Sequence, residues 1–367
     1  MNRRSLLQAW LAGGLAPAAW ATPRTVNFAT ERIATAWQLA GAAAGRGFHV
    51  GVFSLDWEAS RITLDAAVPV TTRAHGLLAL PDGGFAAVAN RPGRWLLRLD
   101  AQGQVVARTD NPPGRSFNGH VEGSDDGQWL FTTETHTADQ SGWVSVRDPQ
   151  TLARVAEFRT DGIDAHQLLH AADGSLLVAH GGILRDAAGR KLEGEGARMA
   201  PSLVRIAPSS GTVLGEWRLS DPQLSIRHIA WSTADSPLLG LALQAEHEDP
   251  RERAAAPVLA LWDGQSLSTP CADTAAAGYV GDITAGPGGG FVLSAQKQGR
   301  GLWWQPAAPD RFTPIAELTE PCALLPSAQG ALLGAGRGLA RWQLAGRSAM
   351  LRWPVALAPD NHAVRLL

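Results

Sequence analysis

Cysteine and tyrosine are nearly missing from this sequence, which has two cysteines, Cys271 and Cys322, and a single tyrosine in 367 residues. Two cysteines are too few for a disulfide framework, and they lack the Cys-x-x-Cys and haem-attachment spacings. Whether the two pair with each other stays open. Also missing are a His-Glu-x-x-His zinc motif, a Gly-x-Ser-x-Gly nucleophile, a Walker loop and a dinucleotide fingerprint. The sequence therefore gives no support to the metalloprotease, serine hydrolase and nucleotide chemistries that use them.

The chain also lacks an excess of charge of one sign and a long apolar run. Its 32 lysines and arginines nearly balance 34 aspartates and glutamates, so there is no basic field for nucleic acid. No segment reaches the roughly 18 to 20 apolar residues that a membrane helix needs. Glycine (40) and proline (23) are abundant and the hydrophobic fraction is 45%. This combination is typical of many short strands joined by tight turns.

The first 22 residues have the features of an export signal. Arg3 and Arg4 are followed by an apolar run and then by Ala19-Trp20-Ala21, a small-x-small cleavage site. The paired arginines resemble a twin-arginine signal, which exports proteins already folded; an ordinary secretory signal is the alternative. We expect residues 1–21 to be removed and residues 22–367 to form one domain in the periplasm.

One hairpin pattern recurs along the chain. The stretches HGLLALPDGGFAAVAN, HVEGSDDGQWLFTTE, HQLLHAADGSLLVAH and HIAWSTADSPLLGLALQ each begin with histidine and contain a strand, a polar turn and a second strand. Two further copies start without histidine, and the six first residues stand at 75, 120, 166, 228, 281 and 322. A period of roughly 40 to 50 residues with several short strands is typical of propeller blades.

The remaining strand-like segments set the number of blades. Alternating pairs such as 94–110, 142–160 and 201–220 supply outer strands, and strand material also stands at both ends of the mature chain. We therefore predict an all-β, seven-bladed β-propeller in which N- and C-terminal strands share one blade, which removes an exposed sheet edge. The insertion at 183–200 is interpreted as a polar loop on one face.

Four histidines occupy the same place in consecutive repeats, namely His75, His120, His166 and His228. We expect them at the entry of the innermost strands, so that four imidazoles converge on one mouth of the channel and bind a metal. The alternative is that each satisfies a buried backbone group and recurs by duplication. His170 is predicted to be solvated at a hairpin corner and His180 to be structural. The flanking residues predicted to bind a ligand are Arg73, Gln167, Arg227, Tyr279 and Asp282, with the two arginines holding a carboxylate beside the metal.

Several short motifs resemble a bacterial family known as domain of unknown function 1513, whose members look like exported propellers. The specific ones are Met-Ala-Pro-Ser-Leu at 199–203 and Leu-Ser-Ile-Arg-His at 224–228. Arg-Ala-His-Gly at 73–76, Gly-Tyr-Val-Gly at 278–281 and Asp-Asn-His at 360–362 also match. Genes of this family commonly lie beside those for imelysin-like and di-haem oxidoreductase-like proteins. The resemblance therefore implies a periplasmic role in iron or copper handling, with those proteins as partners.

The leading interpretation is a propeller that binds a transition metal or metal complex, iron or copper with zinc as an alternative, and has at most weak catalysis. No catalytic residue is assigned. A metal-assisted hydrolase of lactone type and a scaffold for other proteins are the two alternatives, the latter using the channel residues only for structure.

Overall fold

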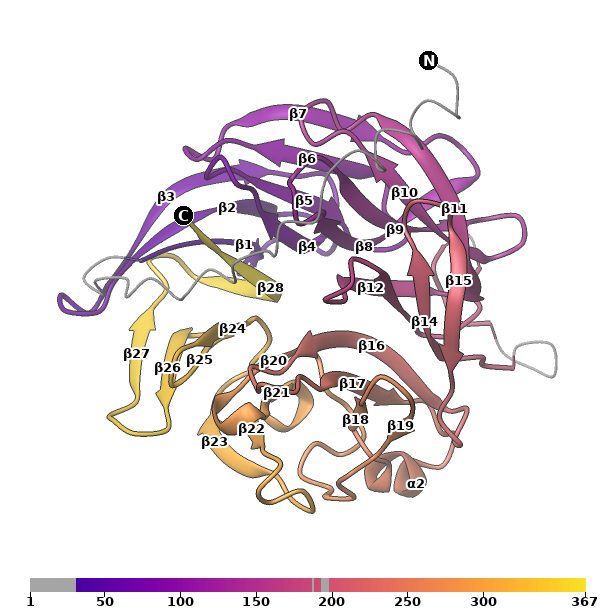
Figure 1. Cartoon of the computed structure of the whole chain (residues 1–367). Helices are drawn as coiled ribbons and strands as arrows, with labels where there is room; N and C mark the ends of the chain where they lie inside the picture. The colour runs from indigo at the N-terminus through magenta and orange to yellow at the C-terminus, as the bar shows by residue number, and fades with distance from the viewer. Residues whose placement is uncertain (1–30, 187, 193–197) are drawn as a thin grey trace.

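The computed structural model describes residues 31–186, 188–192 and 198–367 (Figure 1). They form seven four-stranded antiparallel sheets set around a central axis, which confirms the predicted seven-bladed propeller. The predicted export signal lies outside the described residues, as does part of the predicted loop at 183–200. No helix among the described residues is long and apolar enough to cross a membrane.

Strands from the two ends of the chain share the first blade, as predicted. Its strands, from the axis outward, are β28 (Leu357–Leu366), β1 (Glu31–Leu39), β2 (Phe48–Asp56) and β3 (Arg61–Pro69). The last strand of the chain is thus the innermost strand of the first blade, with Arg32 paired to Leu366. This pairing closes the ring, because backbone hydrogen bonds join the last strand of the chain to the first blade.

In each of the other six blades the chain starts at the axis and runs outward, so the six predicted hairpins are the two innermost strands. The second blade contains β4 (Ala74–Ala79), β5 (Phe85–Ala89), β6 (Trp95–Leu99) and β7 (Val105–Asp110). The third contains β8 (Arg115–Gly123), β9 (Leu130–His136), β10 (Ser141–Arg147) and β11 (Arg154–Ile163). The fourth contains β12 (Ala165–His170), β13 (Leu176–His180), β14 (Ser202–Ala207) and β15 (Thr212–Trp217).

The last three blades follow the same order. The fifth contains β16 (Leu224–Trp231), β17 (Leu239–Ala245), β18 (Leu259–Trp262) and β19 (Leu267–Ser268), with the short helix α2 (Pro250–Ala255) in a connection. The sixth contains β20 (Ile283–Ala285), β21 (Phe291–Ala295), β22 (Arg300–Trp304) and β23 (Thr313–Glu317), with the 3-10 turns η2 (Pro287–Gly289) and η3 (Gln296–Gln298). The seventh contains β24 (Leu324–Ser327), β25 (Gly330–Ala335), β26 (Gly338–Gln343) and β27 (Ala349–Arg352).

The hydrophobic core lies between the blades and not on the axis. Seven clusters of buried apolar side chains are present, one for each pair of neighbouring sheets. Phe85 and Trp95 of the second blade, for example, pack against Val50 and Val52 of the first. Cys271 and Cys322 are buried in two different clusters and form no disulfide. Since the buried apolar clusters lie between neighbouring sheets, polar residues can occupy the channel without interrupting the apolar core.

β-bulges interrupt five of the innermost strands near the axis. Register shifts occur at Ala74/Leu77 in β4, Phe117/Val121 in β8, Ala165/Leu168 in β12 and Ile226/His228 in β16, and opposite residues 359–363 in β28. A histidine lies within or at the edge of each irregularity. Because a bulge turns a side chain out of the alternation of the strand, these bulges direct the histidines into the channel.

Candidate metal centre

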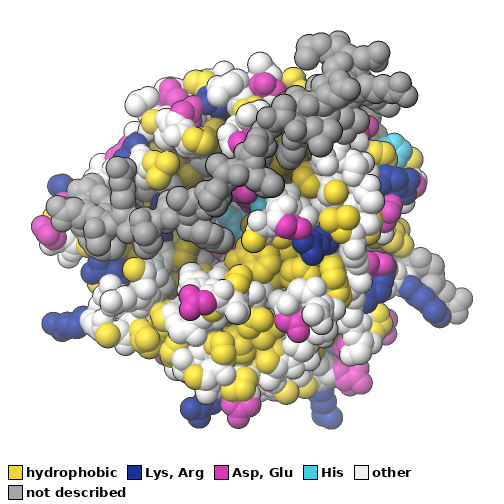
Figure 2. Space-filling view, viewed as in Figure 1, with side chains coloured by type: hydrophobic (Ala, Val, Ile, Leu, Met, Phe, Trp, Pro, Cys, Tyr) yellow, Lys and Arg dark blue, Asp and Glu magenta, His cyan; other side chains and the backbone are white. Residues whose placement is uncertain are grey.

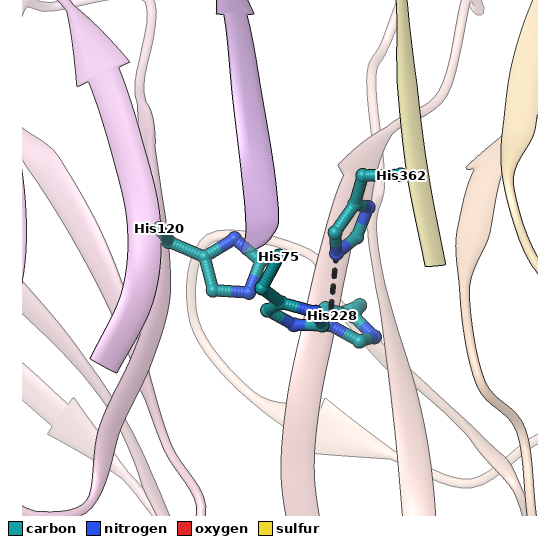
Figure 3. A group of neighbouring side chains, drawn as sticks. All are labelled: His75, His120, His228 and His362. Carbon is teal, nitrogen blue, oxygen red and sulfur yellow. Dashed lines mark hydrogen bonds between the residues drawn. The ribbon is translucent and has the colours of Figure 1, made fainter. Parts of the chain in front are cut away.

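Five imidazoles meet on the propeller axis, each from the innermost strand of a different blade (Figure 3 shows four of them). They belong to His75, His120, His166, His228 and His362. The ring centroids of contacting pairs are 4.6 to 5.6 Å apart, and the first four residues are at most 4% exposed. Figure 2 shows histidine surface at the centre of one face of the molecule. The four histidines predicted from their common register therefore do lie together.

The fifth histidine, His362, was missed by the sequence prediction. It stands on β28, which leads no hairpin, and its place on the axis follows from the shared first blade. The available signal was the Asp-Asn-His motif near the C-terminus. One ring nitrogen from each of His75, His120, His228 and His362 lies within 4.8 Å of the others. These four residues form what we call the histidine cluster.

Nε2 of His228 has more ring nitrogens around it than it can form hydrogen bonds with. Nε2 of His228 lies 3.1 Å from Nε2 of His166, 3.4 Å from Nε2 of His75 and 3.2 Å from Nε2 of His362. A neutral imidazole nitrogen carries either one hydrogen or one lone pair, so at most one of these three contacts is a hydrogen bond. Nε2 of His120 is also buried and has no hydrogen-bond partner among the described residues.

Carboxylates orient two rings of the cluster. Oδ1 of Asp360 lies 3.2 Å from Nδ1 of His75, and Oδ1 of Asp282 lies 3.4 Å from Nδ1 of His362. Burial alone would raise the pKa of Asp360, but the hydrogen bond from His75 and the charge of Arg73 hold that pKa well below its usual range. The ionised carboxylate accepts the Nδ1 hydrogen of His75, which leaves the Nε2 lone pair free to bind a metal.

Arg91 gives His166 a different role from its neighbours. Its Nη1 atom lies 3.0 Å from Nδ1 of His166 and also donates to Asp164 at 2.5 Å. A guanidinium only donates, so Nδ1 of His166 accepts and the hydrogen of its neutral ring sits on Nε2. This Nε2–H group points toward His228, so Nε2 of His166 has no lone pair for a metal. His166 thus contacts the histidine cluster as a hydrogen-bond donor.

The channel imidazoles are held neutral. Burial, followed by the charges of neighbouring arginines and histidines, holds the pKa values of His120, His166 and His228 well below the usual range. Burial also lowers the pKa of His75, against the opposing effect of Asp360, and that of His362. In contrast, burial raises the pKa of Asp282 well above its usual range. Neutral imidazole is the form that binds a metal.

The five predicted ligand-binding residues have separate positions. Arg73, Arg227 and Tyr279 line a cavity of about 360 Å³ beside the histidines. Gln167 uses its Oε1 to accept the backbone N–H of Ile229 at 2.7 Å, which joins two blades. Asp282 accepts the backbone N–H groups of Ile283 and Leu324 and faces His362. These last two residues do not line the cavity.

Two further histidines have structural surroundings. His180 is fully buried and its ring contacts the hydroxyls of Thr160 at 2.8 Å and Ser202 at 3.2 Å, which agrees with the structural role predicted for it. The prediction that His170 is solvated is wrong. Both of its ring nitrogens are shielded from solvent, and its ring packs against Phe131. The hairpin corner is covered by the neighbouring blade, which the sequence pattern does not reveal.

A seven-bladed propeller with a ring of imidazoles around its axis is the class of protein that fold and site define. The chain belongs to the family described as "Protein of unknown function (DUF1513)", whose model matches residues 68–366. A search of curated proteins finds no match.

Solved structures share the fold at low sequence identity. A putative 6-phosphogluconolactonase from Bacteroides fragilis is 13% identical with a TM-score of 0.61, over 94% of this chain and 100% of that one. A streptogramin B lyase is 11% identical with a TM-score of 0.54, over 77% and 83% of the two chains. Kuenenia stuttgartiensis hydrazine synthase is 13% identical with a TM-score of 0.55, over 84% and 92%. At these identities the likeness is one of propeller architecture.

Proposed function

We propose that this protein binds a divalent transition metal ion, iron or copper, at the histidine cluster. The observation that carries the proposal is that one ring nitrogen from each of the four histidines lies within 4.8 Å of the others, with Nε2 of His228 at 3.4 Å from that of His75 and 3.2 Å from that of His362. A metal-nitrogen bond of about 2.0 to 2.1 Å places the nitrogens of a tetrahedral site about 3.4 Å apart. A bound cation converts lone pairs that repel one another into ligands.

The donor set favours a transition metal. Four imidazoles suit Fe, Cu and Zn, whereas Mg²⁺ and Ca²⁺ prefer oxygen ligands. The ionised carboxylate of Asp360 adds negative charge that the imidazoles lack, since it approaches Nδ1 of His75, and the carboxyl group of Asp282 approaches Nδ1 of His362. Carboxylates in this position fix ring orientation and strengthen the imidazole as a ligand. Zinc is an alternative occupant of the same donors.

The place of action is part of the proposal. The N-terminal 22 residues resemble a twin-arginine export signal, so the protein would fold and load its metal before reaching the periplasm. There it would hold iron or copper for acquisition, which the resemblance to the family implies, with imelysin-like or di-haem proteins as partners.

Metal analysis of the full chain, expressed with its signal and purified from the periplasm, tests this function. We expect about one equivalent of iron or copper in the wild type and a loss of it in the double variant His75→Ala/His228→Ala. His136→Gln is the matched control, because His136 has 43% of its side chain exposed and lies outside the cluster. Metal-free wild-type protein, or a double variant that keeps its metal, would refute the proposal. A protein that contains zinc alone would support the metal site and contradict its assignment to iron or copper.

A metal-assisted hydrolase of lactone type is the second candidate. It is favoured by the cavity of about 360 Å³ that opens on His75, His166 and His228, since a substrate carbonyl placed there would lie beside the metal. The putative 6-phosphogluconolactonase shares the fold alone, so the cavity is the reason to test it. Turnover of simple lactones by the metal-loaded protein, abolished in His75→Ala/His228→Ala, would support this function. Metal binding without turnover would support the first.

A further inference from the structure

The cavity beside the histidines has an unusual lining. Four arginines, Arg73, Arg91, Arg185 and Arg227, surround it, and His75, His166 and His228 form its wall on the side of the axis. The other described lining residues are side-chain amides, one tyrosine and one glycine. No carboxylate and no aliphatic side chain is among the described lining residues. A volume of about 360 Å³ is at the small end of the range of ligand pockets, roughly 300 to 1,000 Å³.

The arginines outnumber the carboxylates that hold them. Asp164 does not line this cavity and pairs with both Arg91 and Arg227, at 2.5 and 3.0 Å. Asp360 pairs with Arg73. Arg185 forms no ion pair with any described residue and donates to the carbonyl of Gly189 at 3.0 Å. Four guanidinium groups thus share two directly paired carboxylates, while Glu246, which pairs with Lys191, acts on Arg185 only through its charge, so positive charge is in excess at the cavity.

The buried arginines also have unused donors. Arg227 is 2% exposed, its Nη1 donates to Asp164, and its buried Nε has no hydrogen-bond partner in the described structure. Nε of Arg185 is likewise buried without a partner there. Burial and the repulsion of Arg227 lower the pKa of Arg91 to about 9. Like charges held together in a desolvated space are stabilised by an anion that accepts from several of them.

We propose that this cavity binds a small organic anion with two or more carboxylate groups, gripped by Arg91, Arg185 and Arg227. A planar guanidinium presents paired N–H donors that match the two oxygens of a carboxylate. Because His75 and His228 face the cavity while His120 and His362 do not line it, the anion reaches the metal from one side. That second contact rests on the proposed metal function. The anion then completes the coordination of the ion, and the protein binds a metal-carboxylate complex.

Calorimetric titration of the full mature chain with citrate, with and without metal, tests this inference. We expect the metal-free protein to bind citrate through the arginines and the metal-loaded protein to bind it more tightly. Arg185→Gln should weaken binding by about tenfold or more, the range for a lost hydrogen bond to a charged group. Arg190→Gln is the matched control, since Arg190 has 81% of its side chain exposed and lies outside the cavity. Its affinity should equal that of the wild type.

The outcomes separate the anion site from the metal site. Citrate binding by a protein that never binds metal would retain the anion site and refute the metal function. Metal binding with no citrate binding, or equal losses in Arg185→Gln and Arg190→Gln, would overturn the anion site alone. Inorganic phosphate binding at least as tightly as citrate would overturn the assignment to an organic polycarboxylate. Thermal unfolding of each variant shows whether it is folded, and Arg227→Lys, which keeps the charge and loses the fork, should weaken citrate binding in a folded protein.

Discussion

Nε2 of His362 lies 3.2 Å from Nε2 of His228, although 134 residues separate them in the chain. His362 stands on β28, the strand that closes the ring, whereas His228 stands on β16 of the fifth blade. The contact therefore depends on closure of the propeller. It brings the fifth imidazole to the axis and completes a set of nitrogen donors that the four repeat histidines leave incomplete.

Metal binding should stabilise the folded protein through His228. Addition of the bound metal at about 100 times its dissociation constant should raise the free energy of unfolding of the wild type by about 2.7 kcal/mol. His228→Ala removes the nitrogen at the centre of the contacts and should abolish this gain, whereas His136→Gln should retain it. Urea unfolding with and without metal measures both. A metal-dependent gain that persists in His228→Ala would place the metal elsewhere.

His362 and His166 should differ in their importance for the metal. His362→Ala removes a lone pair of the histidine cluster, so metal affinity should fall by about a hundredfold or more. His166 donates its Nε2 hydrogen because Arg91 donates to its Nδ1, so His166→Ala should change affinity by only a few fold. Competition with a chromophoric chelator gives the two constants. Equal losses in the two variants would mean that His166 is a ligand.

Asp360 should act on the metal through His75. Asp360→Asn keeps the size of the side chain but removes the charge that accepts the Nδ1 hydrogen of His75. We expect a loss of metal affinity of about 10- to 100-fold, as for other carboxylates behind a metal-binding imidazole. Asp139→Asn, on the surface of the third blade, should have no effect. An unchanged affinity in Asp360→Asn would remove this carboxylate from the site.

Gly119 should be required for the position of His75. It has a φ of +101°, and a Cβ atom there would lie 2.8 Å from Cδ2 of the His75 ring. Gly119→Ala should therefore both destabilise the fold by about 1 to 3 kcal/mol and displace the ring, with a loss of metal affinity. Gly114→Ala is the control, because Gly114 has a φ of +85° and an added Cβ would meet no atom within 4 Å. It should lose stability through strain and keep its metal affinity.

Acid should weaken the contribution of His180 to stability. Burial lowers the pKa of His180 to about 4, below the ordinary value of 6.5 that we take for the unfolded chain. Between pH 6.5 and 4 the unfolded chain therefore binds a proton that the folded protein does not, so stability falls as the pH falls. The stability advantage of the wild type over His180→Gln should shrink by about 3 kcal/mol across this window. Urea unfolding at pH 7 and pH 4.5 follows the change, and a constant difference would contradict it.

The fold was largely predictable because local chemistry repeats. Each hairpin carries its own alternation and turn residues, so the six copies and the strands at both ends predict seven blades without knowledge of any contact. The positions of His75, His120, His166 and His228 were predictable for the same reason, since equal places in repeats surround one axis. The family resemblance is confirmed by the match over residues 68–366.

Relationships between blades were decided only by the tertiary structure. His362 leads no repeat and joins the channel because β28 pairs with β1. Arg91 and Arg185 do not recur at equal places in the repeats, yet both line the cavity with Arg227. Arg91, two blades away from His166, determines which ring nitrogen of His166 carries the hydrogen. The sequence alone determined the strands and their number, because alternation and turns act within a few residues. Closure of the ring determines which polar side chains come into contact, because distances across the channel depend on the positions of all seven blades.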